Sequence, residues 1–458
     1  MGIPTEADSS PLVTESRMGD TTGDSLPRSW LCSLRATLAP VTAMRQGFLS
    51  LTDQGVVSIA NFVTGVVIAR ACSKAELGLY MLGFSLVMLV QDVQTSLILT
   101  PYMIYAPRLK GRAHSIYTGS TLGHQLALGV IVAVGVMCGA FACNYRFDRS
   151  LGPVLWALAL VIALIMLREF ARRICFACLQ VRTAFILDVF VSAGQVGGVL
   201  LLARFHMLSA ASAYWVIGAV CGIAVLVWFL SNSDLSFPRL SDSVADFKRN
   251  WSLGKWIFAS GLLWTIGRNA YPWLLAAFHG VAITGVFAAC IGVVSVGNPL
   301  ILGLQNVVGP KISHAYATDG PSAVRRLVLK ISAVIILPVS IYSLILILAG
   351  GRIMVLLYGH QYAGNNLVVA ILALNILVST MTYSFSRALF AIERADLDFL
   401  LNVLGLVIMV TLGLWFVLRF GPLGAALGML TASAITAAIR AAAFLGFQKF
   451  LLNEQEVG

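Results

Sequence analysis

The chain of 458 residues is 59% hydrophobic and only 11% charged, with a mean hydropathy of +0.88. A soluble globular protein has about 25% charged residues, so this composition excludes that class and indicates an all-α membrane protein with many spans. The apolar runs are roughly twice as long as the ~10-residue strands of a membrane β-barrel, which excludes a barrel. The net charge of +11 does not indicate nucleic-acid binding, because the cytoplasmic loops of membrane proteins collect Lys and Arg.

Residues 1–45 are polar and rich in Ser, Thr, Asp and Gly, which predicts a disordered cytoplasmic tail. About twelve apolar segments follow, and each is long enough to cross a bilayer at ~1.5 Å of helix per residue. They lie near residues 48–70, 77–102, 120–143, 151–170, 180–203, 210–230, 254–278, 284–309, 327–349, 365–388, 398–419 and 424–446.

The longest polar connection, residues 231–253, lies midway along the apolar part of the chain. It predicts a cytoplasmic linker between two six-helix bundles, residues 46–230 and 254–447. Residues 448–458 are then a short cytoplasmic tail.

The distribution of Lys and Arg predicts the orientation of the twelve spans. With the N-terminus inside, inner segments hold about 23 of the 31 Lys and Arg residues and outer loops hold about 7. The excess recurs on the same side of every span. The count therefore predicts a multi-pass protein of the cell membrane, inner in a bacterium, with both termini cytoplasmic.

Two stretches of the first half recur in the second half. Residues 173–189 align without gaps with residues 387–403, and Asp188 falls opposite Asn402. A fainter similarity relates the loop and helix start near residue 77 to those near residue 284. An even number of spans separates the copies, so the halves share one orientation and are related by a pseudo-two-fold axis along the membrane normal.

The first two spans carry polar side chains that are costly in lipid. Gln54, Ser58, Asn61 and Gly65 form one stripe along the first span, after Asp53. The second span holds Gln91 and Asp92. The eighth span, in the equivalent place of the second half, adds Asn298 and Gln305 on one face. Such groups often only join helices, but their recurrence in both halves favours a shared polar cavity.

Arg268 is the strongest single candidate for a functional residue. It lies in the seventh span, about 20 Å of helix beyond Lys255, and that span contains no acidic residue. A guanidinium at this depth costs at least ~2.5 kcal/mol. One interpretation is a cationic site, with Asn269 beside it, that holds a phosphate or pyrophosphate. The other is a structural pair with Asp53 or Asp92, or a side chain that reaches toward the headgroups.

Asp53 and Asp92 are also candidate sites for a coupling ion, H+ or Na+, since a carboxylate within the membrane links ion entry to a conformational change. The alternative for Asp53 is a solvated position near the cytoplasmic interface. The basic residues around Arg168 and Arg172 are interpreted as determinants of topology.

The motif D-Q-x3-S-x2-N-F at residues 53–62, A-R at 69–70 and E-L-G-L-Y at 76–80 resembles the start of polysaccharide-biosynthesis flippases of the multidrug/oligosaccharidyl-lipid/polysaccharide (MOP) exporter superfamily, which includes the MATE transporters. R-x2-F-A at 387–391 and F-G-P-L-G-A-A at 420–426 resemble their second half. The resemblance implies two six-helix bundles arranged as a V around a central cavity.

The same resemblance implies alternating access and export of a lipid-diphosphate-linked oligosaccharide, the precursor of a polysaccharide such as an exopolysaccharide, to the outer leaflet. Arg268 matches the cationic cavity that meets the pyrophosphate in such flippases. The implied partners are the lipid-linked sugar, the membrane lipids and polysaccharide assembly proteins.

Two other functions stay open from the residues alone. A cation-coupled multidrug exporter of the same superfamily is the first alternative. A membrane-embedded polymerase or glycosyltransferase is the second, but the outer loops are short and carry only two acids, Glu76 and Asp148. No nucleophile–base pair, metal cluster or phosphate loop is evident, so the sequence predicts a transporter without enzymatic activity, cofactor or metal.

Overall fold

The structure is a computed structural model that describes the backbone of residues 28–146, 149–231, 239–392 and 394–457. Within these ranges some side chains are not described. These include the side chains of residues 28–46, 302–307 and 447–457 and that of Arg268. Residues 1–48 and residues 49–458 form two separate units, and the packing given below is that within residues 49–458.

The first half of the chain forms helices that pack on one another through α5, which contacts α4, α6 and α7. Its elements are α1 (Arg28–Ala71), α2 (Lys74–Gln94), the π-helix η1 (Thr95–Leu99), α3 (Thr100–Tyr105), η2 (Ala106–Arg108), α4 (Arg112–Arg146), η3 (Arg149–Leu151), α5 (Gly152–Ala177), α6 (Val181–Arg204) and α7 (Ala210–Ser231).

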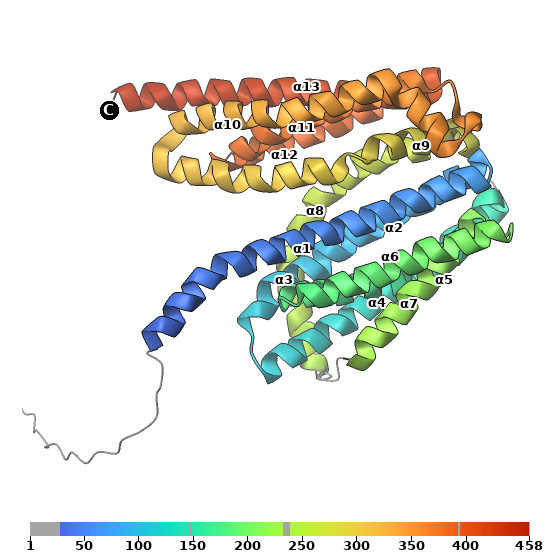
Figure 1. The fold of residues 1–458 in the computed structure, drawn as a ribbon, viewed down its shortest axis with the longest axis horizontal. Helices are drawn as coiled ribbons and strands as arrows, with labels where there is room; N and C mark the ends of the chain where they lie inside the picture. The colour runs from blue at the N-terminus through green and yellow to red at the C-terminus, as the bar shows by residue number, and fades with distance from the viewer. Residues whose placement is uncertain (1–27, 147–148, 232–238, 393, 458) are drawn as a thin grey trace, which may run out of the picture. The chain divides into compact units, whose positions relative to one another are not determined.

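The second half begins with α8 (Leu240–His279), and α11 contacts α9, α10, α12 and α13. Its remaining elements are α9 (Val281–Ser295), α10 (Asn298–Tyr358), η4 (His360–Tyr362), α11 (Asn366–Ala391), α12 (Ala395–Ile408), the π-helix η5 (Met409–Gly413) and α13 (Leu414–Val457). Figure 1 shows α2 to α7 grouped in the lower part of the view and α9 to α13 in the upper part, with α8 running from the lower group toward the upper one.

The helices begin and end where local chemistry requires it. Ser73 precedes α2, and its hydroxyl accepts a hydrogen bond from the backbone N–H of Glu76, which satisfies a free donor of the first turn. Gly280 separates α8 from α9 at a φ of +84°, a conformation that favours glycine. The end of predicted span eleven and the whole of predicted span twelve lie within α13. Gly421, at φ +56°, kinks α13 between these two spans.

The described residues contain nine helical segments long and apolar enough to cross a membrane, and the shorter α9 is also apolar. The protein is a multi-span, all-helical membrane protein. Predicted span eight is divided between α9 and the start of α10. The end of span eight and the whole of span nine lie in α10. Figure 1 shows α10 turning back on itself between them, so the two spans are separate.

Helical structure extends further than the sequence indicates at three places. Residues 240–253 of the predicted linker are the beginning of α8. Residues 28–45 of the predicted tail are helical as part of α1, while residues 1–27 lie outside the described residues. At the other end α13 continues to Val457, through the predicted C-terminal tail. Each stretch is too polar for a span, so hydropathy alone does not identify it as helix.

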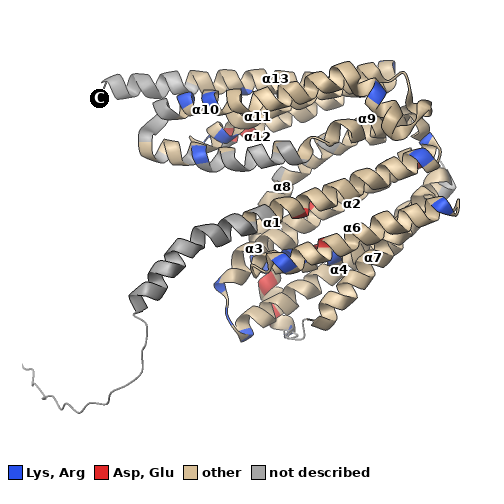
Figure 2. Ribbon diagram, in the orientation of Figure 1, with Lys and Arg blue, Asp and Glu red and all other residues tan. Residues whose placement is uncertain are grey.

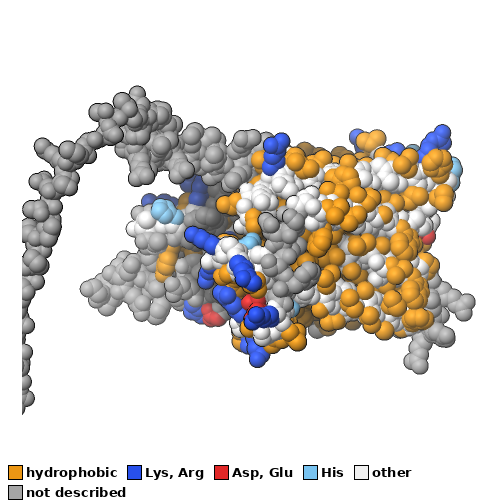
Figure 3. Space-filling model, turned by 90° about the horizontal axis from the view of Figure 1, so that it is seen from below, with side chains coloured by type: hydrophobic (Ala, Val, Ile, Leu, Met, Phe, Trp, Pro, Cys, Tyr) orange, Lys and Arg blue, Asp and Glu red, His pale blue; other side chains and the backbone are white. Residues whose placement is uncertain are grey.

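The two halves meet through α2, α8 and α9: α2 packs on both α8 and α9, and α8 also contacts α3, α4, α12 and α13. The side on which α1 ends and α2 begins is called the outer side below, after the orientation that the Lys and Arg count predicts. Figure 2 shows Lys and Arg mostly toward the helix ends. Figure 3 shows several of them gathered beside a broad apolar field.

Candidate functional site

A buried ion cluster joins three helices of the first half. It consists of Asp53 (α1), Arg168, Glu169 and Arg172 (α5) and Asp188 (α6), and Asp53 and Asp188 are completely buried. Arg172 donates hydrogen bonds to both aspartates, with a distance of 2.6 Å between Nη2 and Asp53 Oδ2. Arg168 donates to Asp188 as well. Glu169 lies within 3.4 Å of both guanidinium groups.

The second half has a smaller cluster around Asn402, the residue that the repeat aligns with Asp188. Arg440 on α13 donates to Asp398 over 2.8 Å and to Asn402 over 2.7 Å, both on α12. Asn402 also donates to Asp398 over 3.1 Å. Asp188 and Asn402, which the sequence repeat aligns, therefore each accept a hydrogen bond from a buried arginine.

These clusters correct two interpretations made from the sequence. Arg168 and Arg172 are held in a buried network rather than acting only as topology determinants at the interface. Asp53 is not solvated, and its described ionic partner is Arg172. The signal was present in the spacing of Arg168, Glu169 and Arg172, since residues three and four apart share a helix face. The partner aspartates lie on other helices and had no local signal.

One residue of the polar stripe on the first span, Asn61, contacts another helix of the first half. Gln195 of α6 donates from Nε2 to Asn61 Oδ1 over 3.2 Å and to Thr64 Oγ1 over 3.0 Å. Gln54, from the same stripe, is exposed. At Asn61 the described contact is thus helix packing within the first half.

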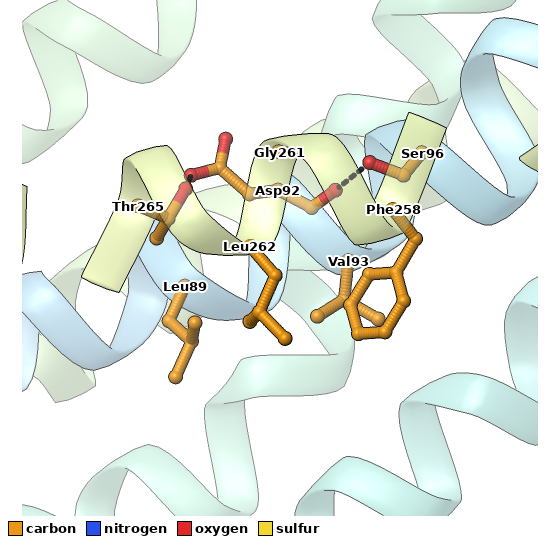
Figure 4. A pocket seen from close by; sticks show the side chains of 8 residues that line it. All are labelled: Leu89, Asp92, Val93, Ser96, Phe258, Gly261, Leu262 and Thr265. Atoms are coloured by element: carbon orange, nitrogen blue, oxygen red, sulfur yellow. Dashed lines mark hydrogen bonds between the residues drawn. The ribbon is translucent and has the colours of Figure 1, made fainter. Parts of the chain in front are cut away.

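A small pocket lies between α2 and α8, where the halves meet. It is lined by Leu89, Asp92, Val93, Ser96, Phe258, Gly261, Leu262 and Thr265. Thr265 donates to the Asp92 carboxylate, and Ser96 donates to the Asp92 backbone carbonyl over 2.8 Å. Figure 4 shows these polar groups together, with the apolar side chains of Leu89, Leu262 and Phe258 on the other side. Asp92 therefore lies at the junction of the halves.

The other candidate residues are placed as follows. The side chains of Arg268 and Gln305 lie outside the described part of the chain, although α8 and α10 contain their backbones. Asn269 donates to the carbonyl of Thr265 within α8, over 3.1 Å. Gln91 is half-buried on α2, and Asn298 is exposed at the start of α10.

The halves make a reciprocal close contact near the outer side. A Cβ added at Gly78 of α2 would lie 1.9 Å from the carbonyl oxygen of Val281, and one added at Gly285 of α9 would lie 1.9 Å from that of Lys74. Gly78 and Gly285 hold the same place in the two weakly similar stretches of the sequence. The contact therefore has the two-fold symmetry expected of the repeat.

Arg70, at the end of α1, and Gln361, in η4 just after α10, add hydrogen bonds to this outer contact. Arg70 donates from Nε to the carbonyl of Leu357 over 2.7 Å and from an Nη to that of Leu356. In return, Gln361 donates to the carbonyl of Ala69 over 2.7 Å. Free carbonyls at a helix end need such donors, so each half satisfies the helix terminus of the other.

Comparison with known proteins gives one family and a fold. A family model described as "Polysaccharide biosynthesis protein" matches residues 120–367. The capsular polysaccharide biosynthesis protein CapF of Staphylococcus aureus is 22% identical over 224 residues, which are 48% of this chain and 56% of CapF. The match to this curated relative thus spans little more than half of its length.

Two solved structures share the fold. The inward-facing conformation of a multidrug resistance MATE family transporter of the MOP superfamily superposes with a TM-score of 0.73, at 14% identity, over 87% of this chain and 96% of that one. The lipid II flippase MurJ in an inward closed conformation gives 0.65, at 13% identity, over 86% and 87%. The fold is therefore that of the MOP superfamily.

Proposed function

The chain belongs to the polysaccharide biosynthesis protein family, with the fold of MOP membrane transporters, and we propose that it is a flippase for a lipid-diphosphate-linked oligosaccharide. It moves this polysaccharide precursor from the inner to the outer leaflet by alternating access and catalyses no chemical reaction. The family match supports polysaccharide biosynthesis as the process. The fold that the chain shares with MurJ supports a lipid-linked substrate.

The observation that carries the proposal is the symmetric contact of Gly78 and Gly285. Alternating access requires two halves that close on one side of the membrane while a path opens on the other. In this structure the halves meet near the outer side at two matched glycines, with Arg70 and Gln361 across the same junction. Small residues allow backbones to approach closely in membranes, so the contact is a suitable place for closure.

A cation-coupled multidrug exporter has the same fold, so the superposition on the MATE transporter does not separate the two functions. The family match favours the polysaccharide precursor, because it covers residues 120–367 and thus parts of both halves. The proposed substrate contacts are polar side chains on α1, α2, α8 and α10: Arg268, Asn269, Gln54, Asn61, Gln91, Asn298 and Gln305.

Arg268→Ala tests this function most directly. A charge-assisted hydrogen bond to phosphate is worth about 1.5–3 kcal/mol, so binding of a lipid diphosphate should weaken roughly 10–100-fold and polymer export should be lost. The measurement is flipping of a fluorescent lipid-diphosphate sugar in proteoliposomes, with membrane insertion checked by protease protection. Arg268→Lys, which keeps the charge, should retain part of the activity. Normal export by Arg268→Ala would remove the proposed site.

Asp53 and Asp92 are the proposed ion-coupling residues. If Asp53 binds a proton or Na+ during transport, Asp53→Asn should keep a hydrogen bond to Arg172 but make flipping independent of the ion gradient. Transport would be measured with and without an imposed H+ or Na+ gradient. Asp398→Asn in the second cluster is the matched control and should keep the dependence. A mutant at position 53 with an unchanged gradient requirement would exclude this role.

The proposed orientation places both termini in the cytoplasm. Reporter fusions at Ser241, before the seventh span, and at His360, between α10 and α11, should then report opposite sides, with Ser241 inside. A reporter that is active only on translocation, paired with one active only in the cytoplasm, distinguishes the two cases. The same side for both positions would mean that the spans between them are miscounted.

A further inference from the structure

The start of α8 has an apolar face that the described helices leave largely exposed, although the Phe247 ring meets His124 of α4 at one edge. Residues 240–253 pack on the first half through a second, polar face: Asn250 accepts a hydrogen bond from Tyr117 over 2.8 Å, and Ser243 bonds to His124 on α4. The Arg249 guanidinium lies 3.9 Å from the centroid of the Tyr105 ring. This part of the helix is therefore held firmly on α3 and α4.

The apolar face consists of Leu240, Val244, Phe247 and Trp251, all exposed, with Leu240 at 83%. Their spacing of four, three and four residues places them on one side of the helix. The rings of Phe247 and Trp251 stack with centroids 6.2 Å apart. This stripe is adjacent to the face packed on α4 and not opposite to it.

A polar face completes the helix. Ser241, Ala245, Lys248 and Ser252 are exposed on it, and Lys255 follows one turn later. A helix with aromatic and aliphatic residues on one side and Lys on the other is typical of segments that lie in the membrane interface. Trp is also enriched at the headgroup level.

The surroundings indicate that the apolar face meets lipid. The α4 span on which this helix packs exposes the apolar side chains of Leu126, Val130 and Ile131, as a span that faces the bilayer does. In Figure 1 the first part of α8 runs across the direction of α2 and α6, as an in-plane helix does. The same helix continues into the predicted seventh span after Gly254, which would keep residues 240–253 near the membrane surface.

We propose that residues 240–253 form an in-plane anchor whose stripe of Leu240, Val244, Phe247 and Trp251 is inserted among the acyl chains of the adjacent leaflet. Lys248 and Lys255 bind the anionic headgroups there. α8 contacts both halves and carries Arg268. The anchor therefore holds α8, the helix between the halves, at the surface of one leaflet. Lipid composition then acts on the transporter through this helix.

Photo-crosslinking of the full-length protein in vesicles of phosphatidylcholine and phosphatidylglycerol tests the anchor. Benzoylphenylalanine would replace Phe247 or Trp251 on the apolar stripe, and Ala245 or Ser252 on the polar face as matched controls. Intact-mass measurement after irradiation should detect lipid adducts on the variants with the probe at position 247 or 251. The variants with the probe at position 245 or 252 should give no lipid adducts. The aromatic replacements at 247 and 251 are close in size, so folding should be kept.

Three outcomes would overturn the proposal. Equal adducts at all four positions would mean that no face is selected, and no adducts at 247 and 251 would mean that the stripe faces water. Cross-links from 247 or 251 to protein would show that a partner or a second copy covers it. A second measurement concerns charge: Lys248→Ala with Lys255→Ala should reduce adducts to phosphatidylglycerol relative to phosphatidylcholine, and an unchanged ratio would contradict the role of the lysines.

Discussion

Arg172→Ala is expected to lower the free energy of unfolding by about 3–5 kcal/mol, because it leaves two completely buried aspartates without their shared guanidinium. Asp53 on α1 would then lose its described ionic partner, and Asp188 on α6 would keep only its ion pair with Arg168. The contact of α1 with α5 would lose its described ion pair, and a buried carboxylate without a partner is costly. Unfolding of the detergent-solubilised protein, followed by helical circular dichroism during titration with SDS, measures the change.

Arg173→Ala is the matched control for this experiment. Arg173 is the next residue, but its side chain is 37% exposed and its described ionic partner is Glu169, at 2.8 Å. An exposed pair contributes about 0–1 kcal/mol, so the control should lie close to the native protein. The double variant Arg172→Ala with Asp188→Ala should cost less than the sum of the single changes, since the residues interact directly. Equal effects at 172 and 173 would contradict the buried network.

Gly78→Ala is expected to abolish transport, because its new Cβ would lie 1.9 Å from the Val281 carbonyl oxygen. The clash is with backbone, so no side-chain rotation relieves it, and α2 and α9 must move apart. Overpacking of this kind costs about 1–3 kcal/mol. That cost applies to the state in which the outer side is closed and not to a state in which α2 and α9 separate.

Symmetry makes this prediction specific. Gly285→Ala should have the same effect, since its Cβ would lie 1.9 Å from the Lys74 carbonyl oxygen. Gly65→Ala on α1 is the control, because no atom lies within 4 Å of a Cβ there. Flipping assays in proteoliposomes, together with labelling of cysteines introduced near residues 74 and 281, measure transport and outer opening. Native transport by Gly78→Ala would show that the contact is not needed for closure.

The positions of the spans follow from the sequence because the hydrocarbon core imposes a length of ~20 apolar residues on each helix. The repeat also carried structural information, since the match near residues 77 and 284 contains the two glycines that later meet. Hydropathy is less informative where a helix is amphipathic, as in residues 240–253, because polar residues at the interface resemble those of a loop.

The composition and the order of residues by themselves determined the class of protein, the approximate spans and the two-fold relation of the halves, because each depends on local hydrophobicity or on similarity along the chain. Only the tertiary structure decided which charges are neutralised and where the halves touch. Arg172 lies between Asp53 and Asp188 because three helices converge there, and a pairing between distant helices leaves no local pattern. Gly78 and Gly285 are close for the same reason.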